Sequence, residues 1–267
     1  MKAGSPAQRR RIAFDEVGST NTLAFEAARA DDPGMLWITA ECQSAGRGRR
    51  GRAWLSERGN LYMSLLLLDP APLADLGNLP LVVAVGVRNG IAGLAGIDDD
   101  RVRIKWPNDI LVGGAKTVGI LIESETLRSG RQAVVIGLGV NVVHWPDDAP
   151  YAVTGLRREG VEASLETIFQ GIAAGVEAAI GLWDRGQRFA AVRRDWIRFN
   201  TGMGGPCRVN LPGGHFAEGR FADLDLQGRL VLERHDGVRE TYSAGDLFLL
   251  PRAAQDDGAA FPHPSRP

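Results

Sequence analysis

The sequence has few cysteines and histidines, and it has no long apolar run. Of its 267 residues, two are cysteines, Cys42 and Cys207, and four are histidines. The cysteines are too far apart to form a metal-binding or redox motif, which fits a reducing cytoplasm. The histidines are scattered, so we predict no metal site built by the protein. No apolar run approaches the length of a membrane span, and we predict no membrane association.

An excess of charge of one sign is also missing. Lys and Arg together number 31, Asp and Glu together 32, and the formal net charge is -1. A dedicated nucleic-acid-binding protein usually carries a basic excess. Hydrophobic residues make up 44% and charged residues 24% of the chain, which is typical of a globular protein. The length allows one large domain and one small domain.

One segment departs from this ordinary composition. Residues Gly46 to Arg52 contain three glycines and four arginines, and Trp54 follows. Glycine is unfavourable in the interior of helices and strands, and it lets a backbone approach a ligand closely. The forked arginine side chain suits carboxylate and phosphate. We therefore interpret the segment as a loop that wraps an anion attached to an aromatic or apolar group. A solvated basic loop and a single-strand nucleic-acid patch remain alternatives.

Strand and helix patterns surround this loop, and a different pattern begins near residue 200. Up to that point, hydrophobic periodicity predicts strands over 12–17, 35–40, 60–68, 102–105, 118–123 and 133–142. It predicts helices over 23–28, 80–95, 165–183 and 189–199, the third capped by Ser164. Beyond it, glycine turns separate short strands expected over 207–211, 215–221, 224–226, 230–232, 238–242 and 246–250.

These patterns divide the chain into four predicted parts. We expect a disordered N-terminus over 1–11, a main domain over 12–200, a small β-barrel over 201–251 and a disordered tail over 252–267. The tail is rich in Pro, Ala and Asp, a composition that cannot bury enough apolar surface to fold.

Three motifs each allow a structural and a functional interpretation. Ser19-Thr20-Asn21 at a strand-to-helix turn is usually a helix cap, but its polar groups can also line a pocket at a helix N-terminus. Lys116, after the Gly113-Gly114 turn, is more simply an exposed edge charge than a cation aimed into a site. Gly137 and Gly139 share one face of a strand. They leave either a slot for a flat ligand or room for a close-packed helix.

Five motifs in this order resemble those of the biotin protein ligases, also called biotin–[acetyl-CoA-carboxylase] ligases. They are Gly18 to Asn21, Gln43 to Trp54, Lys105 to Asp109 (Lys-Trp-Pro-Asn-Asp), Lys116 before Gly119 to Glu123, and Gly137 to Asn141. The resemblance covers about residues 14–250. It implies an α+β fold, with a mixed-sheet catalytic domain that binds biotin and ATP over 12–200 and an SH3-like barrel after it.

The resemblance also implies a reaction. Biotin and Mg²⁺-ATP would give biotinyl-5′-AMP and pyrophosphate. A lysine of a biotin carboxyl carrier protein, or of a carrier domain in a biotin-dependent carboxylase, would then displace AMP. Because the biotin carboxylate and the α-phosphate are both anions, the site has to supply cations and a metal. That metal, Mg²⁺, would arrive with ATP.

Site residues are assigned by the same resemblance. Three residues are expected to be catalytic. Lys116 would act at the biotin carboxylate and the phosphate, Arg49 over the adenylate, and Asp109 beside the acceptor lysine. The expected biotin contacts are Ser19, Thr20, Asn21, Gln43, Gly46, Arg47, Gly48, Arg49, Lys116, Gly137 and Gly139. The expected ATP and adenylate contacts are Arg47, Arg49, Arg50, Arg52, Trp54, Asn108, Lys116 and Asn141, with Trp54 near the adenine. The loop should be mobile when empty and ordered when filled.

Two alternatives to this function remain. Lipoate–protein ligases share the catalytic fold and the acyl-adenylate chemistry, although the arginine loop and Lys-Trp-Pro-Asn-Asp favour the biotin branch. A nucleic-acid-binding module using the loop comes from a different class. Because the first strand starts within fifteen residues, we expect no N-terminal DNA-binding domain and no specific DNA partner. We expect a cytoplasmic enzyme. The sequence leaves open the choice between monomer and homodimer, and which carboxylases are the acceptors.

Overall fold

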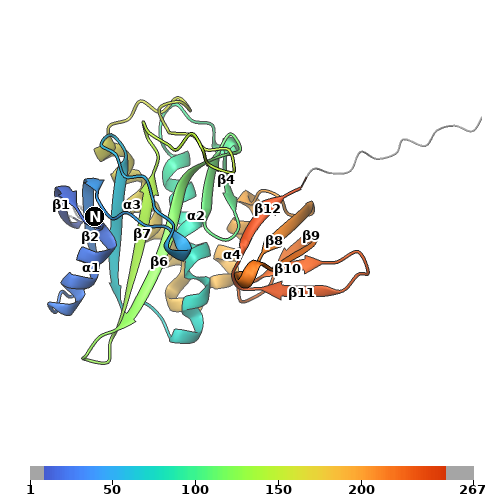
Figure 1. Cartoon of the computed structure of the whole chain (residues 1–267). Helices are drawn as coiled ribbons and strands as arrows, with labels where there is room; N and C mark the ends of the chain where they lie inside the picture. The colour runs from blue at the N-terminus through green and yellow to red at the C-terminus, as the bar shows by residue number, and fades with distance from the viewer. Residues whose placement is uncertain (1–8, 251–267) are drawn as a thin grey trace, which may run out of the picture.

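Seven strands build the sheet of the main domain (Figure 1). The structure is a computed structural model, and it describes residues 9–250 of the chain. The strands are β1 (Arg10–Val17), β2 (Leu36–Gln43), β3 (Leu61–Leu68), β4 (Val102–Lys105), β5 (Asp109–Val112), β6 (Ala115–Thr126) and β7 (Gln132–Val140). They lie in the order β1-β2-β3-β7-β6-β5-β4, with β1 and β2 parallel and the other neighbours antiparallel. This mixed sheet confirms the predicted α+β class.

Helices cover both faces of the sheet (Figure 1). One face carries α1 (Thr20–Arg29), and the other carries α2 (Leu79–Ala92) and α3 (Leu165–Trp183), with α4 (Phe189–Phe199) beside them. Strand alternation explains the division, because successive side chains point to opposite faces. In β2, Leu36 and Ile38 belong to the core under α1, whereas Trp37 belongs to the core under α2 and α3.

The helix α3 is long and apolar enough, by length and composition alone, to cross a membrane. Its apolar face is instead part of the protein core, where Phe169 and Ile172 are fully buried. The ring of Trp37 meets Phe169 edge-on with 5.8 Å between centroids. The helix begins as predicted, since Ser164 Oγ accepts a hydrogen bond from the backbone N–H of Thr167 at 3.1 Å. The buried side chains of α3 therefore form one apolar face that packs on the core.

Five antiparallel strands form the C-terminal β domain. They are β8 (Pro206–Asn210), β9 (Phe216–Leu224), β10 (Leu230–Glu233), β11 (Arg239–Tyr242) and β12 (Asp246–Leu249), in the order β11-β10-β9-β8-β12. This is the SH3-like domain implied by the resemblance. The separate strand expected over 224–226 was wrong, because β9 continues to Leu224 and the chain then turns. Asp225 Oδ1 makes that turn by accepting the backbone N–H groups of Gln227 and Arg229 at 2.9 and 2.8 Å.

The β domain and the main domain share one hydrophobic core. Trp196 of α4 and Phe221 of β9 are both fully buried, with ring centroids 6.4 Å apart. Arg193 Nε donates to the carbonyl of Leu224 at 2.9 Å. The core runs without interruption from α2 and α3 into β8, β9 and β10. The β domain is thus held beside the main sheet, and the start of β12 lies against the arginine loop.

The predicted chain ends need one correction. Arg10 and Arg11, which the sequence assigned to a disordered N-terminus, pair with Leu36 and Trp37 in the β1–β2 ladder. Residues 1–8 and 251–267, which make up most of the two segments expected to be disordered, lie outside the described residues. The domain boundary placed near residue 200 stays a prediction.

Candidate active site

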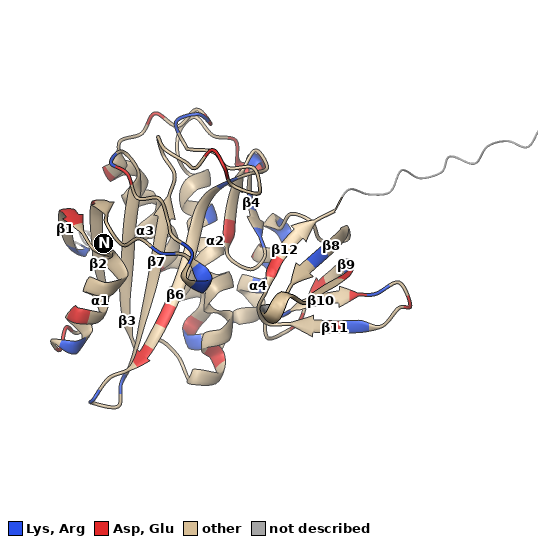
Figure 2. Ribbon diagram, in the orientation of Figure 1, with Lys and Arg blue, Asp and Glu red and all other residues tan. Residues whose placement is uncertain are grey.

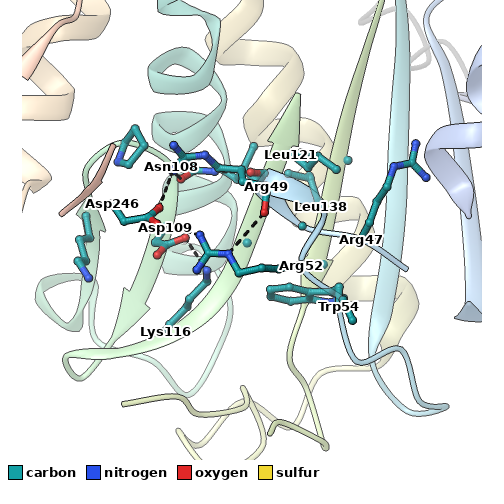
Figure 3. Close-up of a pocket in the computed structure, with 18 of the residues that line it drawn as sticks. Arg47, Arg49, Arg52, Trp54, Asn108, Asp109, Lys116, Leu121, Leu138 and Asp246 are labelled. Atoms are coloured by element: carbon teal, nitrogen blue, oxygen red, sulfur yellow. Dashed lines mark hydrogen bonds and ion pairs between the residues drawn. The ribbon is translucent and has the colours of Figure 1, made fainter. Parts of the chain in front are cut away.

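A cavity lies between the main sheet, the N-terminus of α1, the arginine loop (residues 46–54) and the start of β12. Figure 3 shows Lys116, Asp109 and Arg49 on the side next to Asp246, and Arg47 on the opposite side. The structure brings most of the predicted site residues together here. Those that line the cavity are Ser19, Thr20, Asn21, Gln43, Arg47, Gly48, Arg49, Arg52, Trp54, Asn108, Asp109, Lys116, Gly137 and Gly139.

Three predicted residues lie outside this lining within the described chain, namely Gly46, Arg50 and Asn141. The carbonyl of Gly46 accepts the backbone N–H of Trp54 at 3.0 Å, so Gly46 shapes the loop itself. Arg50 turns toward the β domain, with Nη1 3.1 Å from Asp246 Oδ2. Asn141 is buried, and its backbone N–H donates to a carbonyl just inside β6. The ligand contacts expected of these three residues stay a prediction.

Lys116 points into the cavity from the start of β6. Its Nζ lies 2.7 Å from Asp109 Oδ1, and the two side chains are only 14% and 21% exposed. The indole of Trp54 lies 5.5 Å from the same ammonium group. The interpretation of Lys116 as an exposed edge charge is wrong, because the neighbouring strand β5 brings Asp109 within ion-pair distance. A partly buried cation held in this way is available to a bound anion.

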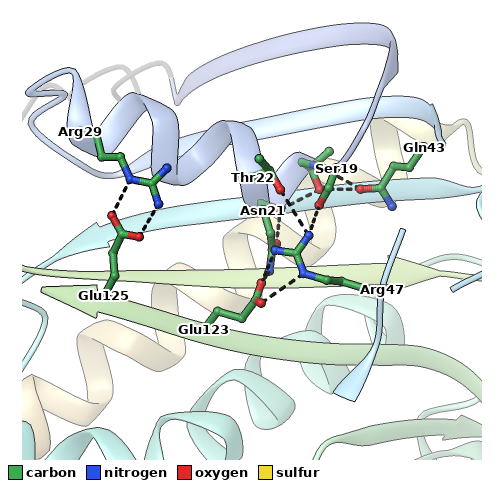
Figure 4. Close-up of polar contacts among 10 residues, drawn as sticks. Ser19, Asn21, Thr22, Arg29, Gln43, Arg47, Glu123 and Glu125 are labelled. Carbon is green, nitrogen blue, oxygen red and sulfur yellow. Dashed lines mark hydrogen bonds and ion pairs between the residues drawn. The ribbon is translucent and has the colours of Figure 1, made fainter. Parts of the chain in front are cut away.

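Arg47 ties the N-terminus of α1 to β6 (Figure 4). Its Nε and Nη2 donate to the two carboxylate oxygens of Glu123 at 3.2 and 2.9 Å, and its Nη1 donates to Ser19 Oγ at 3.0 Å. Asn21 Nδ2 donates to the same carboxylate at 2.7 Å. Ser19 stands at the N-cap position but makes no side-chain capping bond to the helix. The expected cap is therefore absent at Ser19, whose hydroxyl serves the cavity wall instead.

Polar groups at this end of the cavity form a connected chain. Gln43 Oε1 accepts from the backbone N–H of Thr20 at 2.9 Å and from its hydroxyl at 3.1 Å. Ser64 Oγ lies 2.7 Å from Thr20 Oγ1 and 2.6 Å from Asn21 Oδ1. Ser64 is fully buried on β3 and was missed by the sequence reasoning. Linked hydroxyls and amides offer both donors and acceptors to the polar end of a ligand.

Two glycines on neighbouring strands make a flat floor. Gly119 of β6 pairs with Gly139 of β7. A Cβ added at Gly139 would overlap the indole of Trp54, and one added at Gly119 would come within 2.7 Å of it. At Gly137 the added atom would overlap the side chain of Asn21 from α1. The space above Gly139 holds the indole of Trp54, and Gly137 admits a neighbouring helix, which was the alternative interpretation. A slot for a flat ligand at Gly139 stays a prediction.

Trp54 therefore packs on the glycine floor, and its predicted place near the adenine stays a prediction. Its buried indole Nε1 has no hydrogen-bond partner among residues 9–250. An unpartnered buried donor costs on the order of 1–3 kcal/mol. The indole can leave this position, or gain an acceptor from a ligand, without giving up a hydrogen bond.

A second lysine, Lys105, was also missed as a site residue. It lines the cavity, with Nζ 5.8 and 5.5 Å from the ring centroids of Tyr151 and Phe248. Burial lowers the pKa of Lys105, the Asp109 charge opposes this, and the Lys116 charge lowers the pKa further. The chain contains only three lysines. Their rarity was an available signal, since two of the three line one cavity.

The β domain contributes its own wall through Asp246 and Phe248, although the sequence singled out no residue there. Asp246 lies within 3.5 Å of Arg49, 3.1 Å of Arg50 and 3.0 Å of Arg52. Burial lowers the pKa of Arg49, and the nearby carboxylates of Asp246 and Asp109 oppose that shift.

All four loop arginines have acidic partners. Arg47 pairs with Glu123, and the other three pair with Asp246. Figure 2 shows acidic and basic residues interspersed over both domains. A solvated basic loop would leave its arginines unpaired, and a nucleic-acid surface would present a continuous basic stripe. The observed pairing favours neither alternative.

Comparisons with known proteins agree with this geometry. Residues 13–141 match the Biotin/lipoate A/B protein ligase family, and residues 203–250 match the Biotin protein ligase C terminal domain. The chain is 35% identical over 240 residues to the bifunctional ligase/repressor BirA of Bacillus subtilis, covering 87% of this chain and 72% of that protein. It is also 35% identical over 240 residues to the biotin–[acetyl-CoA-carboxylase] ligase of Mycobacterium tuberculosis, covering 88% and 87%.

Solved structures show the same fold. The biotin protein ligase of Aquifex aeolicus in complex with biotin and ATP aligns with a TM-score of 0.76 at 23% identity, covering 92% of this chain and 100% of that chain. The Leishmania major enzyme in complex with biotinyl-5-AMP aligns with a TM-score of 0.64. The fold and the cation-lined cavity define a ligase of the biotin/lipoate class. Within that class, the chain belongs to the biotin protein ligase family.

Proposed function

We propose that this protein attaches biotin to a specific lysine of a biotin carboxyl carrier domain, using ATP and a biotinyl-5′-AMP intermediate. One observation carries the proposal. A glycine floor with a polar end, suited to a flat apolar acid, runs directly into the cation Lys116 and the arginine loop. Family membership supports the same reaction. The Mycobacterium tuberculosis and Paracoccus denitrificans relatives are both named biotin–[acetyl-CoA-carboxylase] ligases, which supports a carboxylase carrier domain as the acceptor.

In the first step, an oxygen of the biotin carboxylate bonds to the α-phosphorus of ATP. The α–β phosphoanhydride bond breaks and pyrophosphate leaves. Lys116 lies where the glycine floor meets the arginines, so it can bind the carboxylate and the α-phosphate together. Arg49 reaches in from the loop, with Nη1 3.2 Å from Asn108 Oδ1. Fixed cations in the cavity lower the repulsion between the two anions.

Magnesium fits this site as part of the substrate Mg²⁺-ATP. Residues 9–250 contain no group of three His, Cys, Asp or Glu side chains that could hold a metal ion. Asn108 and Asp109 offer one or two oxygen ligands beside the cavity, and phosphates and water complete the shell that magnesium prefers. The ion would supply neutralising charge at the phosphates.

In the second step, the acceptor lysine amine attacks the acyl carbon of the adenylate. The bond from that carbon to the AMP oxygen breaks, an amide forms and the amine loses a proton. Asp109 lies at the cavity and is the carboxylate we assign to orienting this amine. The arginine loop above the cavity would exclude water from the hydrolysable anhydride.

The proposal includes a cytoplasmic location. The absence of a specific DNA partner stays a prediction, and a gel shift with promoter DNA from the protein's own operon would test it. Light scattering with and without biotin and ATP would decide between monomer and homodimer.

The test of function is exchange of labelled pyrophosphate into ATP with magnesium and biotin, lipoate or octanoate. We expect exchange with biotin only. Exchange with lipoate or octanoate would move the protein to the lipoate branch of the same fold. No exchange with any acid, from a folded sample, would contradict adenylate formation. Transfer of label from biotin to an added carrier domain would then establish the second step.

A further inference from the structure

The arginine loop is anchored to two different domains. At its start, Arg47 forms two hydrogen bonds to Glu123 of β6 in the main sheet. At its far end, three arginines converge on the single carboxylate of Asp246, at the start of β12 in the β domain. Arg49 Nη2 also donates to the carbonyl of Gly245 at 3.0 Å. The loop therefore bridges the main domain and the β domain.

The turn Arg49–Gly51 has one side-chain contact with the main domain, in which Arg49 Nη1 donates to Asn108 Oδ1 at 3.2 Å. The short turn Arg49–Gly51 buries no residue. Its backbone is left-handed at Arg50 (φ 57°) and at Gly51 (φ 70°), and a non-glycine residue adopts that conformation only when its surroundings hold it there. The carbonyl of Arg52 accepts the backbone N–H of Gly48 at 2.7 Å, which is a bond within the loop itself. Side-chain bonds to the β domain are therefore the main restraint on this end.

We propose that Asp246 is a positioning residue of the β domain that clasps the arginine loop closed over the cavity and so retains the acyl adenylate. Asp246 is 22% exposed, with Oδ2 3.1 Å from Arg50 and 3.0 Å from Arg52. Arg50 does not line the cavity, so its contact with Asp246 serves closure. Retention of an adenylate rests on the proposed function. The clasp itself does not, because it consists of ion pairs between protein side chains.

The loop's composition supplies a direct test of the clasp. Trypsin cleaves after arginine and needs a mobile, extended segment. We expect Asp246→Asn to increase the rate of tryptic cleavage between Arg49 and Arg52 about tenfold in the ligand-free protein, because several pairs that share one carboxylate are lost together. Peptide mass analysis would locate the cut. Glu233→Gln is the matched control, since Glu233 accepts hydrogen bonds from Arg220 and Arg239 on the same domain, in strands away from the loop.

A second measurement follows the intermediate. Enzyme loaded with biotin and ATP would be separated from free nucleotide, and loss of bound biotinyl adenylate would be followed by filter binding. We expect Asp246→Asn to release it about tenfold faster, whereas the control Glu233→Gln should release it at the rate of the unsubstituted protein. An unchanged release rate together with unchanged cleavage would overturn the clasp. A raised KM for ATP with unchanged release would make Asp246 a nucleotide contact, which also overturns it.

Arg50→Met provides an independent variant that keeps the β domain intact. We expect it to raise both cleavage and release, and the double variant with Asp246→Asn to add little more, because both changes remove the same contact. Additive effects would contradict the clasp. If Asp246→Asn does not fold, Arg50→Met alone decides, since Arg50 does not line the cavity and its side chain contacts the β domain. If the unsubstituted protein shows no biotin-dependent exchange, the proposed function fails, and proteolysis still decides the clasp.

Discussion

Lys116 Nζ and Asp109 Oδ1 are 2.7 Å apart across the β5–β6 pair, at the point where the glycine floor gives way to the arginine loop. The pair holds a cation ready at the junction of an apolar slot and an anion site. It also gives that cation a partner before any substrate arrives. An incoming carboxylate must therefore share Lys116 with Asp109 or displace it.

Replacing Lys116 should stop adenylate formation without unfolding the protein. For Lys116→Ala we expect biotin-dependent pyrophosphate exchange to fall on the order of 100-fold or more, because a charge aimed at the developing transition state is lost. The thermal midpoint should change by only a few degrees, since the pair is partly exposed. Circular dichroism would check the fold, and a wild-type exchange rate would contradict the role of Lys116.

Replacing Arg49 should weaken the retention of the biotinyl adenylate in the site. In Arg49→Gly we expect biotin to appear on lysines of unrelated proteins, because the guanidinium that touches Asn108 and the Gly245 carbonyl no longer closes the site. Blotting a mixture of bystander proteins would measure the transfer. The enzyme itself contributes little background, since the chain has three lysines and two line the cavity. Strict acceptor specificity in this variant would count against retention by the loop.

Filling the glycine floor should weaken binding of the acid. A methyl group at Gly139 would overlap the indole of Trp54, so Gly139→Ala should raise the KM for biotin about tenfold, through a steric conflict costing 1–3 kcal/mol. Gly181→Ala is the control, because a Cβ there meets nothing within 4 Å. Steady-state exchange kinetics with varied biotin would compare them. Equal KM values for the two variants would place the acid elsewhere.

The pH dependence of the KM for ATP should reveal the loss of charge on Lys105. Burial lowers the pKa of Lys105. The lysine therefore loses its proton, and with it its attraction for phosphate, at a pH below the ordinary lysine pKa of about 10.4. The KM for ATP should therefore rise with pH in the alkaline range before free lysine titrates. In Lys105→Arg the charge persists, and this rise should disappear. If both proteins share one alkaline profile, another group is responsible.

Much of the fold could be predicted because it depends on local periodicity. Alternating and helical patterns placed most strands and helices of the main domain, and Ser164 marked the start of α3 through its capping bond. The turn at Asp225 was less predictable, since the alternation Leu224-Asp225-Leu226 fits a strand as well as a turn until the contacts of the Asp225 carboxylate are known.

The candidate site, like the fold, could be predicted from the sequence only in part. The glycines and arginines of the loop, the Lys-Trp-Pro-Asn-Asp run and Gly137 to Gly139 indicate an anion site and a slot by residue type alone. Which strand lies beside which depends on pairing between distant segments, which local patterns do not encode. That pairing put Asp109 next to Lys116, Gly119 next to Gly139, and Ser64 beneath Asn21.

The sequence by itself determined the family, the class of fold and the chemistry of the loop, because these follow from residue type and spacing along the chain. Only the tertiary structure decided where the loop's charges go. Arg47 bonds to the main sheet and the other three arginines bond to Asp246, about 195 residues further along the chain. Long-range docking of one domain on another sets such contacts, through a shared core that is assembled only on folding.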